Sequence, residues 1–264
     1  MQKRINYKDV EVEYCDMGEG ACIAFLHGYL ETGEIWEPFA EQFLDHFRVL
    51  IMDLPGHGKS GTWGKIHSME ELAGALYAVL EAEKIDKIFL IGHSMGGYVT
   101  MAFADKYPER LMGYSLFHST CFADSDEKRI NRDREISLVL CGRKRQIITL
   151  NIPKGFADDN VVRLKTEVNR VRNLAFGNTD NGIVAILNGM KQRPDLTHIL
   201  KDPQIPLLLI GGMKDNYIPG EVFEKLVDLA PHARVLRLEE SGHMGFIEEP
   251  ELATEAIMNM VEQK

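Results

Sequence analysis

Short apolar runs alternate with helical patterns along most of this chain, and this alternation restricts the folds open to it. Six runs have the length and composition of buried strands bounded by turn residues: Ala21–Leu26, Arg48–Met52, Lys87–Ile91, Met112–Phe117, Pro206–Ile210 and Arg234–Leu238. Helical patterns follow them at Ser68–Glu83, Val99–Lys106, Pro219–Leu229 and Pro250–Val261. Because alternating strands and helices build a mostly parallel sheet covered on both faces, the pattern predicts an α/β fold.

Two segments depart from the alternation. Arg4–Asn6 and Val10–Tyr14 look like a short antiparallel pair ahead of the parallel strands. Residues 121–202 contain no convincing buried strand, and their apolar residues recur at helical spacing. We therefore predict one core made of residues 1–120 and 203–264, interrupted by a helical cap at 121–202.

Composition excludes several classes of protein. The chain has 264 residues, 45% of them hydrophobic, and 30 Lys+Arg against 40 Asp+Glu give a net charge of −10. It is too apolar to be disordered, and too acidic to favour a nucleic-acid or anionic-membrane partner. No apolar run approaches the roughly 18 residues of a membrane span, and no secretory signal is recognisable. The four cysteines lack metal-ligand spacing, so we expect reduced thiols and no metal site. We also expect a cytoplasmic location and no cofactor. The oligomeric state is not predicted.

The segment Gly92-His93-Ser94-Met95-Gly96 stands directly after an apolar strand and before a helical pattern. A serine there sits on a sharp turn that exposes its hydroxyl, and the small flanking residues avoid backbone collisions. The helix that follows directs its N-terminal amides at the same place, which favours developing negative charge. Ser94 is therefore the predicted nucleophile.

A serine hydroxyl needs a base, and the base needs an acceptor that fixes its tautomer. His243 follows the last predicted strand, where a loop can reach the carboxyl edge of the sheet. Asp215 follows the strand Pro206–Ile210, and the order Ser, Asp, His agrees with a nucleophile-elbow enzyme. Asp124 is the rival acid, because it follows the preceding strand.

An acyl-transfer reaction also needs two donors for the oxyanion. The amide of Met95 follows the nucleophile, and the amide of Tyr29 lies in the loop after Ala21–Leu26. We expect Gly28 to permit the turn of this loop beside the substrate and His27 to order it through hydrogen bonds.

With these residues in place, the sequence resembles the α/β-hydrolase fold superfamily, in particular its cap-bearing Ser–Asp–His members. The resemblance rests on His27-Gly28, the run Asp53-Leu54-Pro55-Gly56-His57-Gly58-Lys59-Ser60, the Ser94 elbow, Asp215 and Ser241-Gly242-His243. It implies an eight-stranded, mostly parallel sheet and an activity like that of esterases, proline iminopeptidase-like enzymes or the menaquinone-pathway synthase. In such proteins the run around Asp53 and His57 shapes a loop beside the active site, so we interpret both residues as structural.

The predicted cap differs in charge from the core. Residues 121–202 carry 15 Lys+Arg and 11 Asp+Glu, a net of +4, which leaves −14 for the rest. A solvated helix face would explain this, but inward-pointing arginines would bind an anionic acyl substrate. Our candidates for substrate contacts are Arg129 and Arg143, with His118 near the entry to the cap.

We therefore predict a serine hydrolase that cleaves a carboxylic ester or related acyl bond of a small molecule through an acyl-enzyme. Two alternatives stay open at this point. The same triad serves carbon–carbon bond hydrolases and lyases, and the fold also serves as a non-catalytic small-molecule receptor.

Overall fold

Eight strands form the centre of the protein: β1 (Gln2–Tyr7), β2 (Val10–Met17), β3 (Cys22–Leu26), β4 (Arg48–Met52), β5 (Ile88–His93), β6 (Leu111–Phe117), β7 (Leu207–Gly212) and β8 (Arg234–Leu238). The structure is a computed structural model, and it describes residues 1–262. The sheet order is β1-β2-β4-β3-β5-β6-β7-β8; β2 is antiparallel to β1 and β4, and the other neighbours are parallel. Each predicted buried strand is present within two residues of its predicted ends, which confirms the α/β fold with a mostly parallel sheet.

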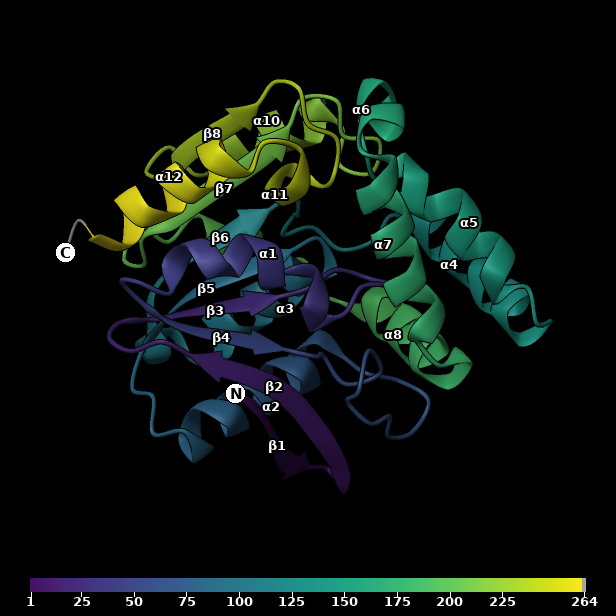
Figure 1. The fold of residues 1–264 in the computed structure, drawn as a ribbon, viewed down its shortest axis with the longest axis horizontal. Coiled ribbons are helices and arrows are strands. Elements are labelled where there is room, and N and C mark those ends of the chain that lie inside the picture. Colours follow the sequence, from purple (N-terminus) through teal and green to yellow (C-terminus); the bar gives the residue numbers. More distant parts are fainter. Residues whose placement is uncertain (263–264) are drawn as a thin grey trace.

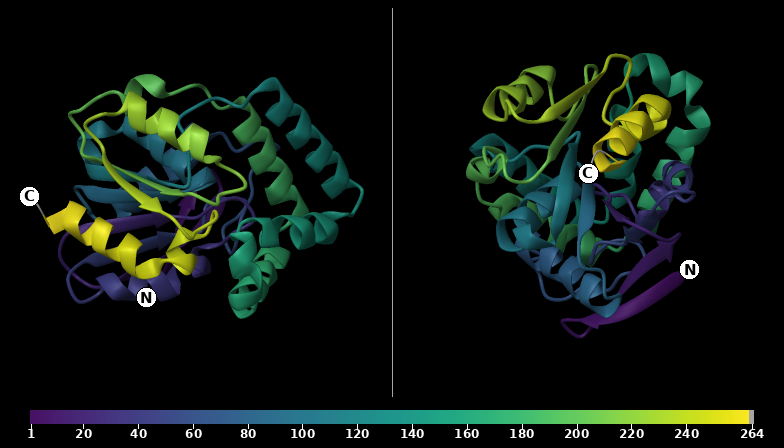
Figure 2. Two further views of the ribbon diagram at one scale, coloured as in Figure 1. Left: turned by 90° about the horizontal axis from the view of Figure 1, so that it is seen from above. Right: turned by 90° about the vertical axis from the view of Figure 1, so that its left-hand side faces the viewer.

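Helices cover both faces of this sheet. Figures 1 and 2 show α1 (Glu37–Ala40) and α12 (Pro250–Glu262) on one face, and α2 (Met69–Ala82) and α3 (Met95–Lys106) on the other. Two further helices, α10 (Gly220–Leu229) and α11 (Gly245–Glu248), lie in the C-terminal part, and short 3₁₀ turns occupy Gly33–Ile35, Glu41–Phe43 and Pro108–Arg110. The segment 33–43 carried no helical prediction.

The beginnings of two helices test the sequence reasoning. At α2, which begins where its helical pattern begins, the Ser68 hydroxyl accepts from the Glu71 amide at 3.2 Å, and the Glu71 carboxylate accepts from the Ser68 amide at 3.2 Å. Helix α3 begins at Met95, four residues before the predicted Val99. Gly96 and Gly97 hid this first turn, because glycine disfavours a helix interior, whereas packing against the sheet keeps it helical here.

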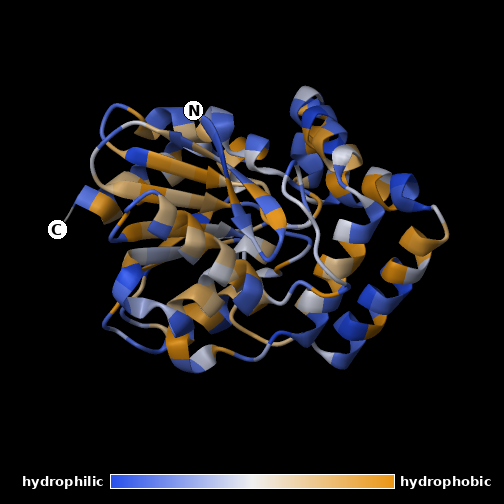
Figure 3. Cartoon of the chain, turned by 90° about the horizontal axis from the view of Figure 1, so that it is seen from below, coloured by the Kyte–Doolittle hydropathy of each residue, from blue (hydrophilic) through white to orange (hydrophobic). Residues whose placement is uncertain are grey.

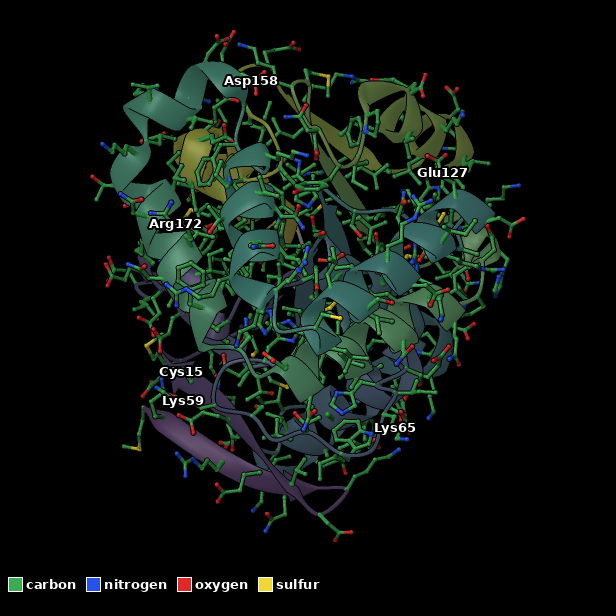
Figure 4. The ribbon with its side chains drawn as sticks, turned by 90° about the vertical axis from the view of Figure 1, so that its right-hand side faces the viewer. Cys15, Lys59, Lys65, Glu127, Asp158 and Arg172 are labelled. Atoms are coloured by element: carbon green, nitrogen blue, oxygen red, sulfur yellow. The ribbon has the colours of Figure 1, made fainter. Side chains whose placement is uncertain are left out.

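A helical insertion separates β6 from β7, as predicted. It contains α4 (Asp126–Leu140), α5 (Lys144–Lys154), α6 (Asp158–Arg163), α7 (Lys165–Gly177), α8 (Asp180–Gln192) and α9 (Thr197–Leu200). Figure 1 shows α4 to α8 beyond the carboxyl ends of the strands. Figure 4 looks onto this insertion, where Glu127 on α4 and Asp158 on α6 are exposed on its outer side. The insertion therefore covers the sheet edge at which the predicted catalytic residues stand.

The hydrophobic core lies along the central strands. All residues of β3, β5 and β7 are buried, and Figure 3 shows the strands as largely hydrophobic while the surrounding helices alternate in hydropathy. This is the pattern of a sheet that is packed on both faces. Within residues 1–262, no helix is both long and apolar enough to cross a membrane.

Candidate active site

Ser94 occupies the sharp turn between β5 and α3. Its backbone has φ 50° and ψ −113°, a strained conformation for a residue with a side chain. The turn is tight on both sides, because a Cβ on Gly92 would lie 2.4 Å from the carbonyl oxygen of Gly96, and one on Gly96 would lie 2.4 Å from that of Leu26. The Ser119 hydroxyl donates to the Ser94 carbonyl at 2.6 Å and helps to hold this geometry.

His243 and Asp215 meet beyond the ends of β8 and β7. Nδ1 of His243 donates to Oδ2 of Asp215 at 2.7 Å, and both side chains are buried. The other oxygen, Oδ1, accepts from the amides of Tyr217 and Ile218 at 2.7 and 3.0 Å. Burial alone would raise the pKa of the Asp215 carboxyl, but the attraction of His243 and the hydrogen bonds from the histidines beside it outweigh burial and hold that pKa well below its usual range.

Two backbone amides stand beside the nucleophile without a protein acceptor. Within residues 1–262, neither the Tyr29 N–H nor the Met95 N–H donates to a group of the protein. Met95 begins α3 directly after Ser94, and Tyr29 lines the same cavity as Ser94. Unpaired amides at such a place are suited to an oxyanion.

Buried histidines order the loop that carries Tyr29. Nδ1 of His27 donates to the Gly28 carbonyl at 2.8 Å, while its Nε2 accepts from the Leu54 amide at 2.9 Å. Nε2 of His57 accepts from the amide of Leu30 at 3.1 Å. Leu30 has φ 64°, so this hydrogen bond supports a strained turn.

Asp53 holds the neighbouring loop. Its Oδ1 accepts from the Gly33 amide at 2.6 Å, and its Oδ2 accepts from the Lys59 amide at 2.8 Å. A Cβ on Gly58, which has φ 56°, would lie 2.2 Å from this carboxylate. The acid is thus a loop organiser, in agreement with the structural interpretation of the Asp53–Ser60 run.

A cavity of about 230 Å³ lies between the sheet edge and the insertion. Ser94 and His243 open into it. Its other lining residues are Tyr29, Leu30, Glu31, Tyr98, Lys128, Asn131, Arg132, Glu135, Asn151, Ile152, Gly155, Met190, Tyr217, Ile218 and Met244. The wall contributed by α4 is polar, and the remainder is mainly apolar, so the cavity fits a small molecule with one polar end.

The side chains of His118, Asp215 and His243 place one ligand atom each within 4.8 Å of one another, a separation that metal ligands can have. Their hydrogen bonds indicate another use. Nδ1 of His243 donates to Asp215, and the amides of Gly212 and Gly245 point at Nδ1 and Nε2 of His118 at 3.0 and 3.1 Å. We interpret the cluster as a hydrogen-bonded support for the base.

Known proteins share this fold. Residues 22–116 match the alpha/beta hydrolase fold family. The pimeloyl-[acyl-carrier protein] methyl ester esterase of Yersinia enterocolitica is 28% identical, over 93% of this chain and 95% of that protein. A thermophilic esterase from Thermogutta terrifontis, solved with malate bound, superposes with a TM-score of 0.94 at 29% identity, over 100% of this chain and 98% of that one.

The chain has the alpha/beta hydrolase fold and esterases among its relatives. The enol-lactonase from Burkholderia xenovorans LB400 shares the fold as well, with a TM-score of 0.91 over 99% of this chain and 100% of that one, at 21% identity.

None of the four predicted substrate contacts lines this cavity. Arg129 is exposed and faces Asp126 at 3.7 Å, and Arg143 is exposed at the beginning of α5. His118 is fully buried behind Asp215, 3.4 Å from its Oδ2, so it contacts the acid of the site. Gly28 lies in the loop of Tyr29, where its amide donates to the Glu31 carboxylate at 2.5 Å.

The rival acid Asp124 is part of another cluster. Its carboxylate pairs with Arg132 and, at 2.7 Å, with Nη1 of Arg193. Arg132 lines the cavity, whereas Arg129 does not. Helical spacing distinguishes Arg132 from Arg129. Lys128, Arg132 and Glu135 lie at i, i+4 and i+7, on the same helix face as the buried Val139 at i+11.

Sequence reasoning also missed Glu31. It lies four residues beyond His27, is 2% exposed, and pairs with His93 at 2.9 Å. Glu34 stands in the same loop, so an acidic residue there does not by itself reveal a partner 62 residues away.

Proposed function

We propose that this protein hydrolyses a carboxylic ester of a small molecule through the Ser94–His243–Asp215 triad. The observation that carries the proposal is the convergence on one cavity of a nucleophile-elbow serine, a carboxylate-paired histidine and two unpaired amides. The relatives support it, since the Yersinia protein is a methyl ester esterase and the Thermogutta protein an esterase.

The reaction follows from the roles of these groups. His243 takes the proton of the Ser94 hydroxyl as its oxygen attacks the ester carbonyl, and Asp215 stabilises the resulting imidazolium. The amides of Tyr29 and Met95 donate to the oxyanion. His243 returns the proton to the departing alkoxide, which leaves as an alcohol, and an acyl-enzyme stays on Ser94. Water, deprotonated by His243, then attacks the acyl carbon; the bond to the Ser94 oxygen breaks, His243 returns the proton to that oxygen, and the acid is released.

The polar wall of the cavity supports an anionic group in the substrate. Asp124 is a single carboxylate shared by Arg132 and Arg193, so this cluster keeps one positive charge, and Lys128 adds another. Glu135 opposes them with a negative charge, although burial raises the pKa of its carboxyl. We propose that Arg132 and Lys128, rather than Arg129 and Arg143, face a carboxylate or phosphate of the ester.

Covalent labelling by a fluorophosphonate tests the reaction class. The wild type should be labelled at Ser94 and should hydrolyse a panel of short acyl esters, while Ser94→Ala should lose the label and lose several orders of magnitude in kcat. Ser137→Ala, on the exposed side of α4, is the matched control and should behave as wild type.

Two results would overturn the proposal. Equal labelling of wild type and Ser94→Ala would remove the serine nucleophile and favour the receptor alternative. Turnover of a β-diketone by a protein that leaves every ester intact would move the reaction to carbon–carbon cleavage.

A further inference from the structure

A second carboxylate–histidine pair lies beside the proposed triad. Nδ1 of His93 and Oε2 of Glu31 are 2.9 Å apart, and the two side chains are 0% and 2% exposed. His93 immediately precedes the elbow serine in the chain, and Glu31 lies in the turn that follows Tyr29. A buried ion pair is costly to form, and removal of one partner leaves an uncompensated buried charge. The groups that the pair contacts therefore indicate what the pair does.

The hydrogen bonds of His93 determine its charge. Nδ1 faces the Glu31 carboxylate, and Nε2 faces the backbone carbonyl of His243 at 2.8 Å. Both partners are acceptors, so both ring nitrogens must donate, and only the imidazolium form has two N–H groups. Burial alone would lower the pKa of His93, but the Glu31 carboxylate outweighs burial and leaves it raised. Burial likewise opposes the charge of Glu31, and the attraction of His93 leaves its pKa lowered.

The pair touches the two loops that the reaction needs. Oε2 of Glu31 also accepts from the Gly28 amide at 2.5 Å, one residue before the proposed oxyanion donor Tyr29. At the other end, His93 holds the carbonyl of the proposed base His243. A Cβ on Gly28 would lie 2.9 Å from both Glu31 Oε2 and His93 Nδ1, so glycine is required where the three groups meet.

We infer that Glu31 and His93 are a positioning pair that ties the oxyanion loop to the loop of the catalytic histidine. The inference rests on the proposed serine mechanism for its kinetic consequence. The pair contacts backbone on either side of the nucleophile, so it fixes how far the Tyr29 amide and the His243 imidazole stand from Ser94. Displacing reacting groups by about 1 Å can cost about 100-fold in rate.

Aromatic side chains surround the histidine of this pair. The ring of His93 packs against Trp36, Phe117 and Phe246, with centroid distances of 6.2, 6.5 and 5.0 Å. The other titratable groups that influence the pair are His243, His118 and Asp215 around the His93 ring, and His27 near Glu31. Two acids contact these histidines. Oδ2 of Asp215 lies 3.4 Å from Nδ1 of His118, and Oε2 of Glu31 lies 2.9 Å from Nδ1 of His93.

Kinetics of Glu31→Gln test the positioning role. The change keeps the size of the side chain but removes its charge, and we expect kcat for a short ester to fall about 100-fold while KM stays within about 2-fold. Glu83→Gln is the matched control, because Glu83 is also a poorly exposed acid paired with Lys3 and Arg48, at the opposite edge of the sheet. It should lose stability without losing kcat. If Glu31→Gln keeps the wild-type kcat, the inference is wrong.

Nitrogen-15 spectra of the histidine rings test the pair without any variant. In wild type, both ring nitrogens of His93 should carry protons at pH 8, and Glu31→Gln should remove one of them. A wild-type spectrum in which one His93 nitrogen is unprotonated would overturn the assignment, even if the variant fails to fold. A failure of the proposed function would give a different result. Fluorophosphonate would then not label Ser94, while both ring nitrogens of His93 would still carry protons.

Discussion

His93 and His118 both pack against the proposed base, their own ring centroids lie 6.1 Å apart, and their hydrogen-bond partners differ in kind. His93 faces two acceptors, whereas the amides of Gly212 and Gly245 point at the two ring nitrogens of His118, of which a neutral imidazole can accept with one. Both rings are fully buried. Equal burial therefore accompanies different charge states, a cationic His93 and a neutral His118, because the partners decide which protonation state is satisfied.

The first prediction concerns stability at acid pH. Burial lowers the pKa of His118 from 6.5 to about 4, although the Asp215 carboxylate opposes the shift. Between these values the unfolded chain binds a proton that the folded protein does not, so the free energy of unfolding should decrease as pH falls from 6.5 toward 4. The shift corresponds to roughly 3 kcal/mol at the acid end.

Urea unfolding at a series of pH values measures this effect. His118→Asn removes the titrating ring and should flatten the slope between pH 6.5 and 4, whatever its effect at pH 7. His198→Asn, at an exposed histidine, is the control and should keep the wild-type slope. An unchanged slope in His118→Asn would show that this ring is not the group that titrates.

A second prediction addresses Asp215. Asp215→Asn should keep the fold but lower kcat by about 10⁴-fold, because an amide no longer fixes the tautomer of His243 or stabilises its imidazolium. Asp16→Asn, which also loses a poorly exposed acid with ion-pair partners, should leave kcat intact. A loss of less than 10-fold in Asp215→Asn would point to another acid.

The third prediction separates the cations of the insertion. Arg132→Ala should raise KM for an anionic ester about 10- to 100-fold and leave a neutral ester of equal length almost unaffected, since a charge-assisted hydrogen bond contributes roughly 1.5–3 kcal/mol. Asp124 keeps its pair with Arg193 in this variant. Lys128→Ala should act in the same direction. Arg129→Ala is the control on the same helix, and equal effects on both esters would exclude an anion site.

Much of this site could be predicted because its residues stand at strand ends. Ser94, Asp215 and His243 each follow a strand of a parallel sheet, and such strands bring their carboxyl ends to one edge. The Met95 and Tyr29 amides were predictable for the same reason. A residue that directly follows a parallel strand in the chain must lie at this edge of the sheet, so short motifs were sufficient to predict these residues.

The remaining residues depend on contacts that no local pattern specifies. Glu31 and His93 are 62 positions apart, and each alone resembles an ordinary loop residue. Within α4, Arg129 and Arg132 have the same chemistry, and only the rotation of the helix against the core separates them. Helical periodicity gives that rotation when the buried stripe is clear, but α4 has one fully buried residue, Val139, and its stripe is correspondingly weak.

The last prediction concerns how the insertion is attached. Gly189 of α8 packs so closely on the core that a Cβ would lie 1.6 Å from the His67 carbonyl oxygen, whereas one on Gly177, at the end of α7, would meet nothing within 4 Å. Gly189→Ala should therefore lower the free energy of unfolding by about 1–3 kcal/mol. It should also raise KM, because the neighbouring Met190 lines the cavity. Gly177→Ala should be neutral or stabilise by up to about 1 kcal/mol. Urea unfolding and ester kinetics on both variants check this, and equal behaviour of the two would mean that α8 moves away from the core without cost.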